Sequence, residues 1–298
     1  MTKKFLFALL FATRLTRLVA WLNRRNVSIL CYHSVTRRPE AYPNDRHKMH
    51  LPVDSFLRHL DFLQAHYQII SLAEFVRARR EDIRLPARAA ILTFDDGVRN
   101  FFTVVAPLLL ERGVPVTSFI MTGENFTPAS ASRSGLNGSW RPEDDTSYLS
   151  WSEVRQLATR GVEFGSHTCT HRSLTEITQA QARGELEESL NSLNTNLGQS
   201  SFPLSYPHGK TSVGISRLSE SLGYSCGVTA VLGQNDSECD LFALRRTIVA
   251  SDDDLPTFAA RVSGLTSWYN SLAGIFSALP SEDLDPSPIC YDPIVAEE

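Results

Sequence analysis

Short apolar runs alternate with amphipathic stretches of helix length along most of the chain. The runs typical of strands lie at residues 27–32, 68–70, 88–94, 115–121, 162–165, 202–205, 224–231 and 246–249. Stretches with apolar residues three and four positions apart predict helices over 54–66, 101–112, 178–197, 212–222 and 255–262, and further helices that begin near 71 and 150. Strands that alternate with helices predict a largely parallel sheet with helices outside, either as a closed barrel or as an open doubly wound sheet.

One predicted strand runs directly into two acidic residues. The segment Ile91-Leu-Thr-Phe ends in Asp95, Asp96 and Gly97. Carboxylates at the end of a buried strand are costly unless a metal ion or an arginine lies beside them. Because successive strand side chains point to opposite sides, we expect one carboxylate to bind a metal and the other to face a reacting water. The alternative is an Asp-Asp-Gly turn with both carboxylates in solvent.

Further polar residues follow predicted strands at their carboxyl ends, which lie together at one face of a parallel α/β fold. Together with the two aspartates they are His33, His167 and Tyr206. The four-residue spacing of His167 and His171 lets both imidazoles share a metal on one side of a helical turn. The alternative is two polar residues in a solvated loop. Two histidines and one carboxylate leave coordination positions open, which is the pattern of a catalytic metal site.

The composition excludes several classes of protein. A hydrophobic share of 42% and a charged share of 21% are those of a globular protein with a large core. A formal net charge of -4 argues against nucleic acid as a partner. The five cysteines have no metal-type spacing, so we expect reduced thiols in a reducing compartment. No Gly-x-Ser-x-Gly elbow and no glycine-rich phosphate loop occur, which argues against a serine hydrolase and a nucleotide enzyme.

The first 25 residues have a character of their own. Two lysines precede an apolar run over residues 5–12, and arginines then alternate with apolar residues at helical spacing up to Arg25. Three interpretations stay open: a basic amphipathic helix on an anionic membrane surface, a helix packed on the protein's own outside, or an atypical signal anchor. We therefore expect a cytoplasmic or membrane-peripheral location, with peripheral membrane contact through residues 1–25.

Three polar segments interrupt or end the pattern. The stretch 123–148 is rich in Ser, Asn, Gly and Pro, as in a lid, a binding loop or a disordered insertion. Glu185, Glu187 and Glu188 on the predicted helix 178–197 are typical of a solvated face. The acidic, proline-bearing tail from about residue 280 is expected to be loose. The chain thus divides into a segment 1–25, a domain 26–265 and an extension 266–298.

Three motifs in order carry a resemblance to a known family. The segments Thr93–Gly97, His167–His171 and Ser205–Gly209, read as Thr-Phe-Asp-Asp-Gly, His-Thr-Cys-Thr-His and Ser-Tyr-Pro-His-Gly, resemble the polysaccharide deacetylase family. This family is also called carbohydrate esterase family 4 or the NodB-homology domain, and the resemblance extends over about residues 27–264. It implies a distorted (β/α)7-type barrel with parallel strands and outer helices, and metal-dependent removal of acetyl groups from sugars.

The resemblance also implies roles for individual residues. Asp95 matches the catalytic base, and Asp96, His167 and His171 match the ligands of one divalent metal ion. Zinc is the first choice for that ion, with cobalt, nickel and manganese as alternatives. The backbone N–H of Tyr206 is expected to help hold the oxyanion.

The chain departs from the usual motifs at two places. Ser205 stands where the third motif usually has an arginine, and Leu244-Arg-Arg246 resembles a later Leu-Pro-Arg motif of one branch of the family. Arg246 is therefore the expected partner of Asp95. The usual C-terminal Leu-x-His is missing, while Cys31-Tyr-His-Ser34 resembles the N-terminal Tyr-His motif of the same branch, so His33 is the expected general acid. His208 stands where an aromatic residue is common.

The sequence therefore predicts a metal-dependent deacetylase of an acetylated oligo- or polysaccharide or of a saccharide precursor. One alternative is hydrolysis of another linear or cyclic amide. The other is a carbohydrate-binding relative without activity, against which the intact aspartate pair and His-x-x-x-His argue.

Overall fold

We describe the protein from a computed structural model, in which residues 3–41, 45, 47–123 and 147–269 can be described. Almost all of the predicted insertion 123–148, and the tail from residue 270 onward, lie outside these ranges.

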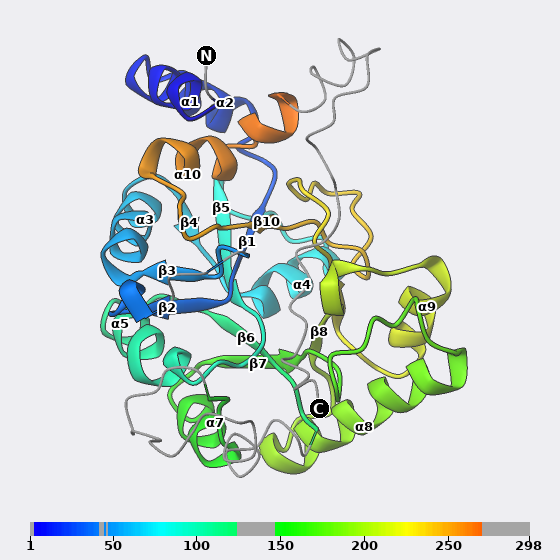
Figure 1. Cartoon of the computed structure of the whole chain (residues 1–298). Coiled ribbons are helices and arrows are strands. Elements are labelled where there is room, and N and C mark those ends of the chain that lie inside the picture. The colour runs from blue at the N-terminus through cyan, green and yellow to red at the C-terminus, as the bar shows by residue number, and fades with distance from the viewer. Residues whose placement is uncertain (1–2, 42–44, 46, 124–146, 270–298) are drawn as a thin grey trace.

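A curved parallel sheet forms the centre of the described chain (Figure 1). Its strands follow the order β10-β1-β5-β6-β7-β8-β9, and β4 pairs with β5 beside this path. The bounds are β1 Ser28–Tyr32, β4 Gln68–Ile69, β5 Ala89–Phe94, β6 Thr117–Ile120, β7 Glu163–Ser166, β8 Pro203–Ser205, β9 Cys226–Val228 and β10 Thr247–Ile248. A parallel bridge between Val228 and Leu244 brings the end of β9 near the start of β10. The fold is a distorted α/β barrel, as the resemblance implies, and the open doubly wound alternative is wrong.

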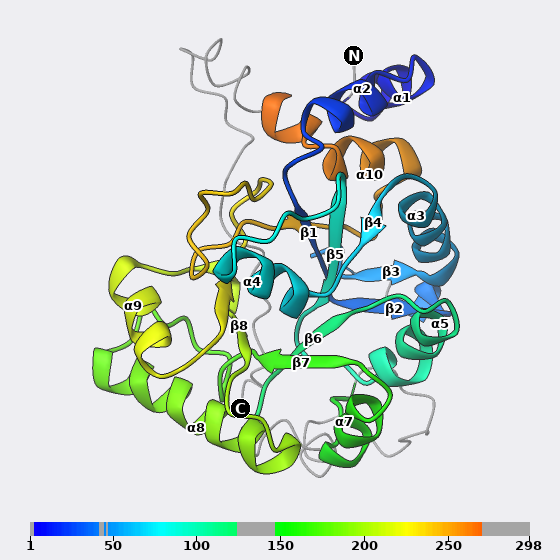
Figure 2. The ribbon, with the colours of Figure 1, turned by 180° about the vertical axis from the view of Figure 1, so that it is seen from behind.

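Helices surround the sheet on its outside (Figures 1 and 2). They are α1 Lys3–Ala12, α2 Leu15–Leu22, α3 Val53–His66, α4 Leu72–Arg80, α5 Ala106–Glu111, α7 Trp151–Ala158, α8 Gln179–Leu197, α9 Val213–Ser221 and α10 Leu255–Val262. Capping boxes at Ser150 and Thr178 fix the starts of α7 and α8, because each hydroxyl and its glutamate or glutamine partner pair with orphan N–H groups. The short strands β2 (Ser34–Thr36) and β3 (His50–Pro52), which pair with each other in parallel, were not predicted.

An aromatic cluster locks β1 to β5 at the ends that carry candidate site residues. Tyr32 stacks on Phe94 with ring centroids 5.1 Å apart, and Phe56 of α3 meets Tyr32 edge-on at 5.4 Å. All three side chains are buried. Because His33 follows Tyr32 and Asp95 follows Phe94, this packing sets where both polar side chains emerge.

The N-terminal helices α1 and α2 form a layer outside α10 (Figure 1). Phe7 and Val19 are buried against Ala260 and Leu265, and Asn23 Nδ2 donates to the Ser263 carbonyl at 2.9 Å. The inner face of α1 and α2 therefore packs on the protein's own outside, as the second of the three interpretations predicts.

Candidate active site

A buried ion pair joins the end of β5 to the segment before β10. Arg246 donates from both terminal nitrogens to the two carboxylate oxygens of Asp95, each at 2.7 Å. Its Nε donates to the Thr229 carbonyl at 2.9 Å, which fixes the guanidinium plane. The structure thus brings Arg246 to Asp95, in the place of the arginine missing from the third motif, while the catalytic roles of both stay predictions.

Two smaller groups complete the surroundings of Asp95. Ser205 donates from Oγ to Asp95 Oδ2 at 3.0 Å, and the Cys31 thiol points at the same oxygen at 3.5 Å. Burial by itself raises the pKa of Asp95, but the charge and hydrogen bonds of Arg246, together with the neighbouring histidines, outweigh burial, and the pKa lies well below its usual range. Asp95 is therefore held as a carboxylate. Neither Ser205 nor Cys31 had been assigned a contact with it from sequence.

Asp96 and Gly97 form a left-handed turn that separates the two carboxylates. The φ angles of Asp96 and Gly97 are 72° and 66°, and a Cβ on Gly97 would lie 2.9 Å from Ile120 Cγ2. Glycine is required there on both counts. The turn aims Asp96 away from Arg246 and towards His167. Both aspartates are buried, so the solvated Asp-Asp-Gly alternative is wrong.

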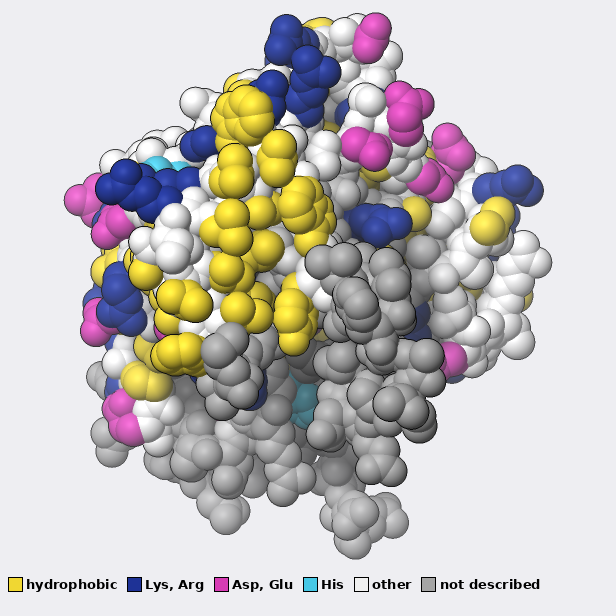
Figure 3. Space-filling model, turned by 90° about the horizontal axis from the view of Figure 1, so that it is seen from above, with side chains coloured by type: hydrophobic (Ala, Val, Ile, Leu, Met, Phe, Trp, Pro, Cys, Tyr) yellow, Lys and Arg dark blue, Asp and Glu magenta, His cyan; other side chains and the backbone are white. Residues whose placement is uncertain are grey.

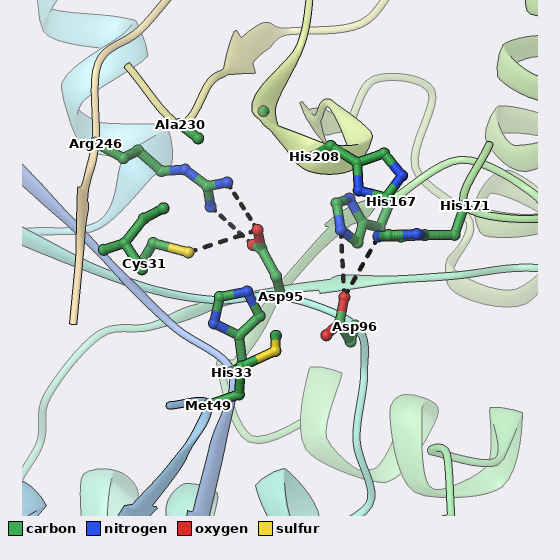
Figure 4. A pocket seen from close by; sticks show the side chains of 12 residues that line it. Cys31, His33, Met49, Asp95, Asp96, His167, His171, His208, Ala230 and Arg246 are labelled. Atoms are coloured by element: carbon green, nitrogen blue, oxygen red, sulfur yellow. Dashed lines mark hydrogen bonds and ion pairs between the residues drawn. The ribbon is translucent and has the colours of Figure 1, made fainter. Parts of the chain in front are cut away.

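Asp96, His167 and His171 gather their ligand atoms in one place. One ligand atom from each residue lies within 4.8 Å of the others, and Asp96 Oδ1 is 3.4 Å from His167 Nε2 and 3.7 Å from His171 Nε2 (Figure 4). His167 Nδ1 lies 2.8 Å from the Ser205 carbonyl, which accepts its proton and leaves Nε2 turned towards Asp96. Burial, followed by the neighbouring His167, lowers the pKa of His171 to about 3, so this imidazole is neutral as a ligand must be.

The loop between the two histidines is held by Glu185 of α8. Glu185 Oε2 accepts from the backbone N–H groups of Cys169 at 3.0 Å and Thr170 at 2.8 Å, and Oε1 accepts from the Thr170 hydroxyl. Glu185 is buried, so the prediction that it belongs to a solvated face is wrong. Its position between the buried Ala182 and Ser189 on one face of the helix was the signal that could have shown this.

His33 lies on the far side of Asp95 from the two metal-site histidines (Figure 4). A ring nitrogen of His33, Cys31 Sγ and an Asp95 oxygen lie within 4.8 Å of one another. The candidate acid, base and metal ligands line one pocket, whose walls are Cys31, His33, Met49, Asp95, Asp96, His167, His171, His208, Gly209, Ala230, Arg246 and Ile248. One cavity therefore brings together every predicted site residue except Tyr206.

Tyr206 does not take the position predicted for it. Its backbone N–H donates to the Val228 carbonyl at 3.2 Å, and its hydroxyl donates to the Phe242 carbonyl at 3.0 Å. The N–H is engaged in the pairing of β8 with β9, so the expectation that it holds an oxyanion does not fit this structure. The residues of this motif that line the pocket are His208 and Gly209; His208 has a φ of 58°, and its ring centroid lies 4.8 Å from that of His171.

Known proteins resemble this chain in sequence. The family model described as polysaccharide deacetylase matches residues 82–227. YxkH of Bacillus subtilis, which carries a provisional name as a polysaccharide deacetylase, is 23% identical over 250 residues, or 83% of this chain and 80% of YxkH. The poly-beta-1,6-N-acetyl-D-glucosamine N-deacetylase of Escherichia coli is 34% identical over 122 residues, which are 40% of this chain and 17% of that enzyme's length.

A solved structure supports the fold. The Streptococcus pyogenes deacetylase PplD, in complex with acetate, superposes with a TM-score of 0.66 at 21% identity and covers 80% of this chain and 98% of PplD. At that identity the likeness shows the shared distorted barrel. With the family model, the relatives and the fold in agreement, the matched region of this chain, residues 82–227, belongs to the polysaccharide deacetylase family.

Proposed function

We propose that this protein is a metal-dependent deacetylase that hydrolyses N-acetyl groups on hexosamine units of a polysaccharide or its precursor. The observation that carries the proposal is the common pocket. It combines an open set of three metal ligands with a separate buried carboxylate paired to Arg246. The ion pair with Arg246 keeps Asp95 out of the set of metal ligands and holds it beside the reacting centre.

The three ligands fit a divalent ion by their chemistry. Two imidazole nitrogens and one carboxylate oxygen are the donors that zinc prefers, and the His167 tautomer fixed by the Ser205 carbonyl turns Nε2 to the site. A bound ion would polarise the acetyl carbonyl and lower the pKa of a bound water to about 7. We propose zinc, with cobalt, nickel or manganese as the alternatives to be distinguished by experiment.

The residues of the chain divide the proton transfers between them. Asp95 accepts a proton from the water whose oxygen bonds to the acetyl carbon, and Arg246 keeps this carboxylate ionised and oriented. His33, on the other side of Asp95, donates a proton to the sugar nitrogen as the C–N bond breaks. The products are acetate and a free amine, and deprotonated His33 and protonated Asp95 return to their starting states by exchange with solvent.

The substrate class is supported by a relative. The E. coli protein is named for its action on poly-beta-1,6-N-acetyl-D-glucosamine, and its matched segment is 34% identical to this chain. We therefore propose an N-acetylglucosamine polymer of the exopolysaccharide type as the first substrate to test.

The decisive experiment measures acetate release from N-acetylglucosamine oligomers by the full chain, with chelator and with each added metal. The variants Asp95→Asn and His167→Ala are measured for both turnover and bound metal. We expect chelator-sensitive release that is lost in both variants, with metal retained in Asp95→Asn and lost in His167→Ala.

Other results would revise the proposal in different ways. Release that is unaffected by chelator or by Asp95→Asn would refute the assigned mechanism. Metal binding without acetate release from any sugar would exclude saccharide deacetylation and direct the search to other amides or to carbohydrate binding.

A further inference from the structure

The outer face of the N-terminal helices is apolar, although their inner face is already buried on α10. The side chains on this outer face are 37 to 59% exposed, and they are Phe5, Leu9, Leu15, Leu18, Trp21 and Leu22. We call these six residues the apolar band. Figure 3 shows a continuous hydrophobic strip over the N-terminal helices, seen from outside the barrel. A helix that is apolar on both its inner and its outer face normally has a partner on each.

Positive charge lies beside parts of the apolar band. Residues 1–25 carry six lysine and arginine side chains and no aspartate or glutamate, whereas the whole chain has a formal net charge of -4. Arg14, Arg17 and Arg25 are exposed. Lys and Arg side chains lie along the margins of the strip in Figure 3. Such strong asymmetry in a net acidic chain points to an anionic partner.

From these observations we infer that the apolar band docks onto an anionic lipid surface. An apolar strip rimmed by arginines matches the interface of a bilayer, where hydrocarbon lies under acidic headgroups. Trp21 suits this boundary, with Arg24 placed 4.4 Å above its ring. None of the six residues lines the catalytic pocket, so docking leaves the pocket open to a polymer.

The geometry favours docking in the plane of the membrane over spanning it. No single helix among the described residues has the length and apolar composition to cross a bilayer; α1 and α2 together meet that test, with a bend of 83° between them. Phe7 and Val19 hold the bent pair on the barrel by their inner face. Straightening the pair into one span would expose this packing, whereas in-plane docking keeps it.

The test uses the full chain and flotation with two kinds of vesicle, phosphatidylcholine alone and phosphatidylcholine containing phosphatidylglycerol. We expect binding to the anionic vesicles that falls with added salt. Leu18→Asp and Trp21→Asp should each weaken this binding by about tenfold or more, because each removes a large apolar side chain from the interface. Arg14→Gln and Arg17→Gln should each weaken it by about fivefold.

Matched controls lie on α9, away from the N-terminal layer. Val213 is 69% exposed and Arg217 is exposed, so Val213→Asp and Arg217→Gln make the same chemical changes elsewhere. These controls should bind vesicles like the unaltered protein, and acetate release in solution should be unchanged in all six variants.

Several outcomes would overturn the inference. One is that the full chain does not bind anionic vesicles. Another is that the α9 control variants lose as much binding as the variants in the apolar band. A third is that only detergent releases the protein from the membrane, which would indicate a span. A dimer in solution that Trp21→Asp separates, without vesicle binding by the unaltered protein, would show that a second copy covers the band.

Discussion

Glu185 offers the sharpest test of how the candidate metal site is built, because it is neither a candidate ligand nor part of the pocket lining. Its carboxylate accepts three hydrogen bonds from Cys169 and Thr170, within the loop that separates the two histidine ligands. Thr168 and His171 both have left-handed φ angles, 64° and 63°. Each such residue costs about 1 kcal/mol, so the loop needs outside support to keep its shape.

Glu185→Ala removes that support at once. Two backbone N–H groups lose their acceptor, at about 1 to 3 kcal/mol each, and part of this cost is recovered as the loop relaxes. We expect the remainder to appear as metal affinity lowered by about 10- to 100-fold, the usual range for partners that orient ligands. Glu185→Gln keeps one oxygen that can accept from both backbone amides, because the Thr170 hydroxyl can turn to accept from the new NH₂ group, so the loss of metal affinity should be smaller.

The assay is competition for zinc against a chromophoric chelator, with turnover measured at saturating zinc. Turnover of Glu185→Ala should recover at saturating metal, because Asp95 and Arg246 are untouched. Glu187, on the same helix, pairs only with the exposed Arg183 among its described contacts, so Glu187→Ala is the matched control. The reasoning is refuted if folded Glu185→Ala binds zinc as tightly as Glu187→Ala.

Three further predictions follow from buried groups. Arg246→Met should destabilise the fold by about 3 to 5 kcal/mol, because it leaves the buried carboxylate of Asp95 without a counterion. Chemical denaturation checks this, and an unchanged midpoint would contradict it. Burial lowers the pKa of His59 to about 4, so the unfolded chain binds its proton first as pH falls. The contribution of His59 to the free energy of unfolding is therefore fully present above pH 6.5, and up to about 3 kcal/mol of stability is lost as the pH falls from 6.5 to 4. The stability of His59→Phe, measured by denaturation, should therefore lack this part of the pH dependence. If His59→Phe and the unaltered protein lose stability equally between pH 6.5 and 4, the prediction is wrong. Gly97→Ala should cost about 1 to 3 kcal/mol, from its positive φ and the contact with Ile120, and calorimetry that finds an equal melting temperature would count against this.

Much of the fold could be predicted because each local pattern agreed with the tertiary structure. The helices expected near residues 71 and 150 begin directly after the capping serines Ser71 and Ser150, and the mostly apolar run before Asp95 marked a strand buried on both sides. Closure of the sheet could not be predicted from periodicity, because it depends on the bridge between Val228 and Leu244, which lie in different segments. The strands β2 and β3 are three residues each, too short to show a period.

Some contacts of the candidate site could likewise be predicted from the sequence, and others could not. Ligands four residues apart, or at the end of a strong strand, carry a local signal, and the structure brings Asp96, His167 and His171 together. The contacts of Cys31 and Glu185 join distant segments, so spacing alone gives no sign of them. The hydrogen bond from the Tyr206 N–H to Val228 could not be predicted either, because the side of a strand that an amide faces depends on its neighbour's register, which its own sequence does not contain.

The adjacency of β1 and β10 links the chemistry of the pocket to completion of the chain. The region 82–227 contains both aspartates and both metal-site histidines, but His33 comes before it and Arg246 after it. A growing chain therefore contains all three candidate metal ligands before Arg246, the counterion of Asp95, is synthesised. Only when β10 docks beside β1 is Asp95 charge-compensated. Under the proposed mechanism the matched region alone would lack both the expected general acid and the arginine that orients the base, so activity would depend on segments that lie on both sides of that region in the sequence.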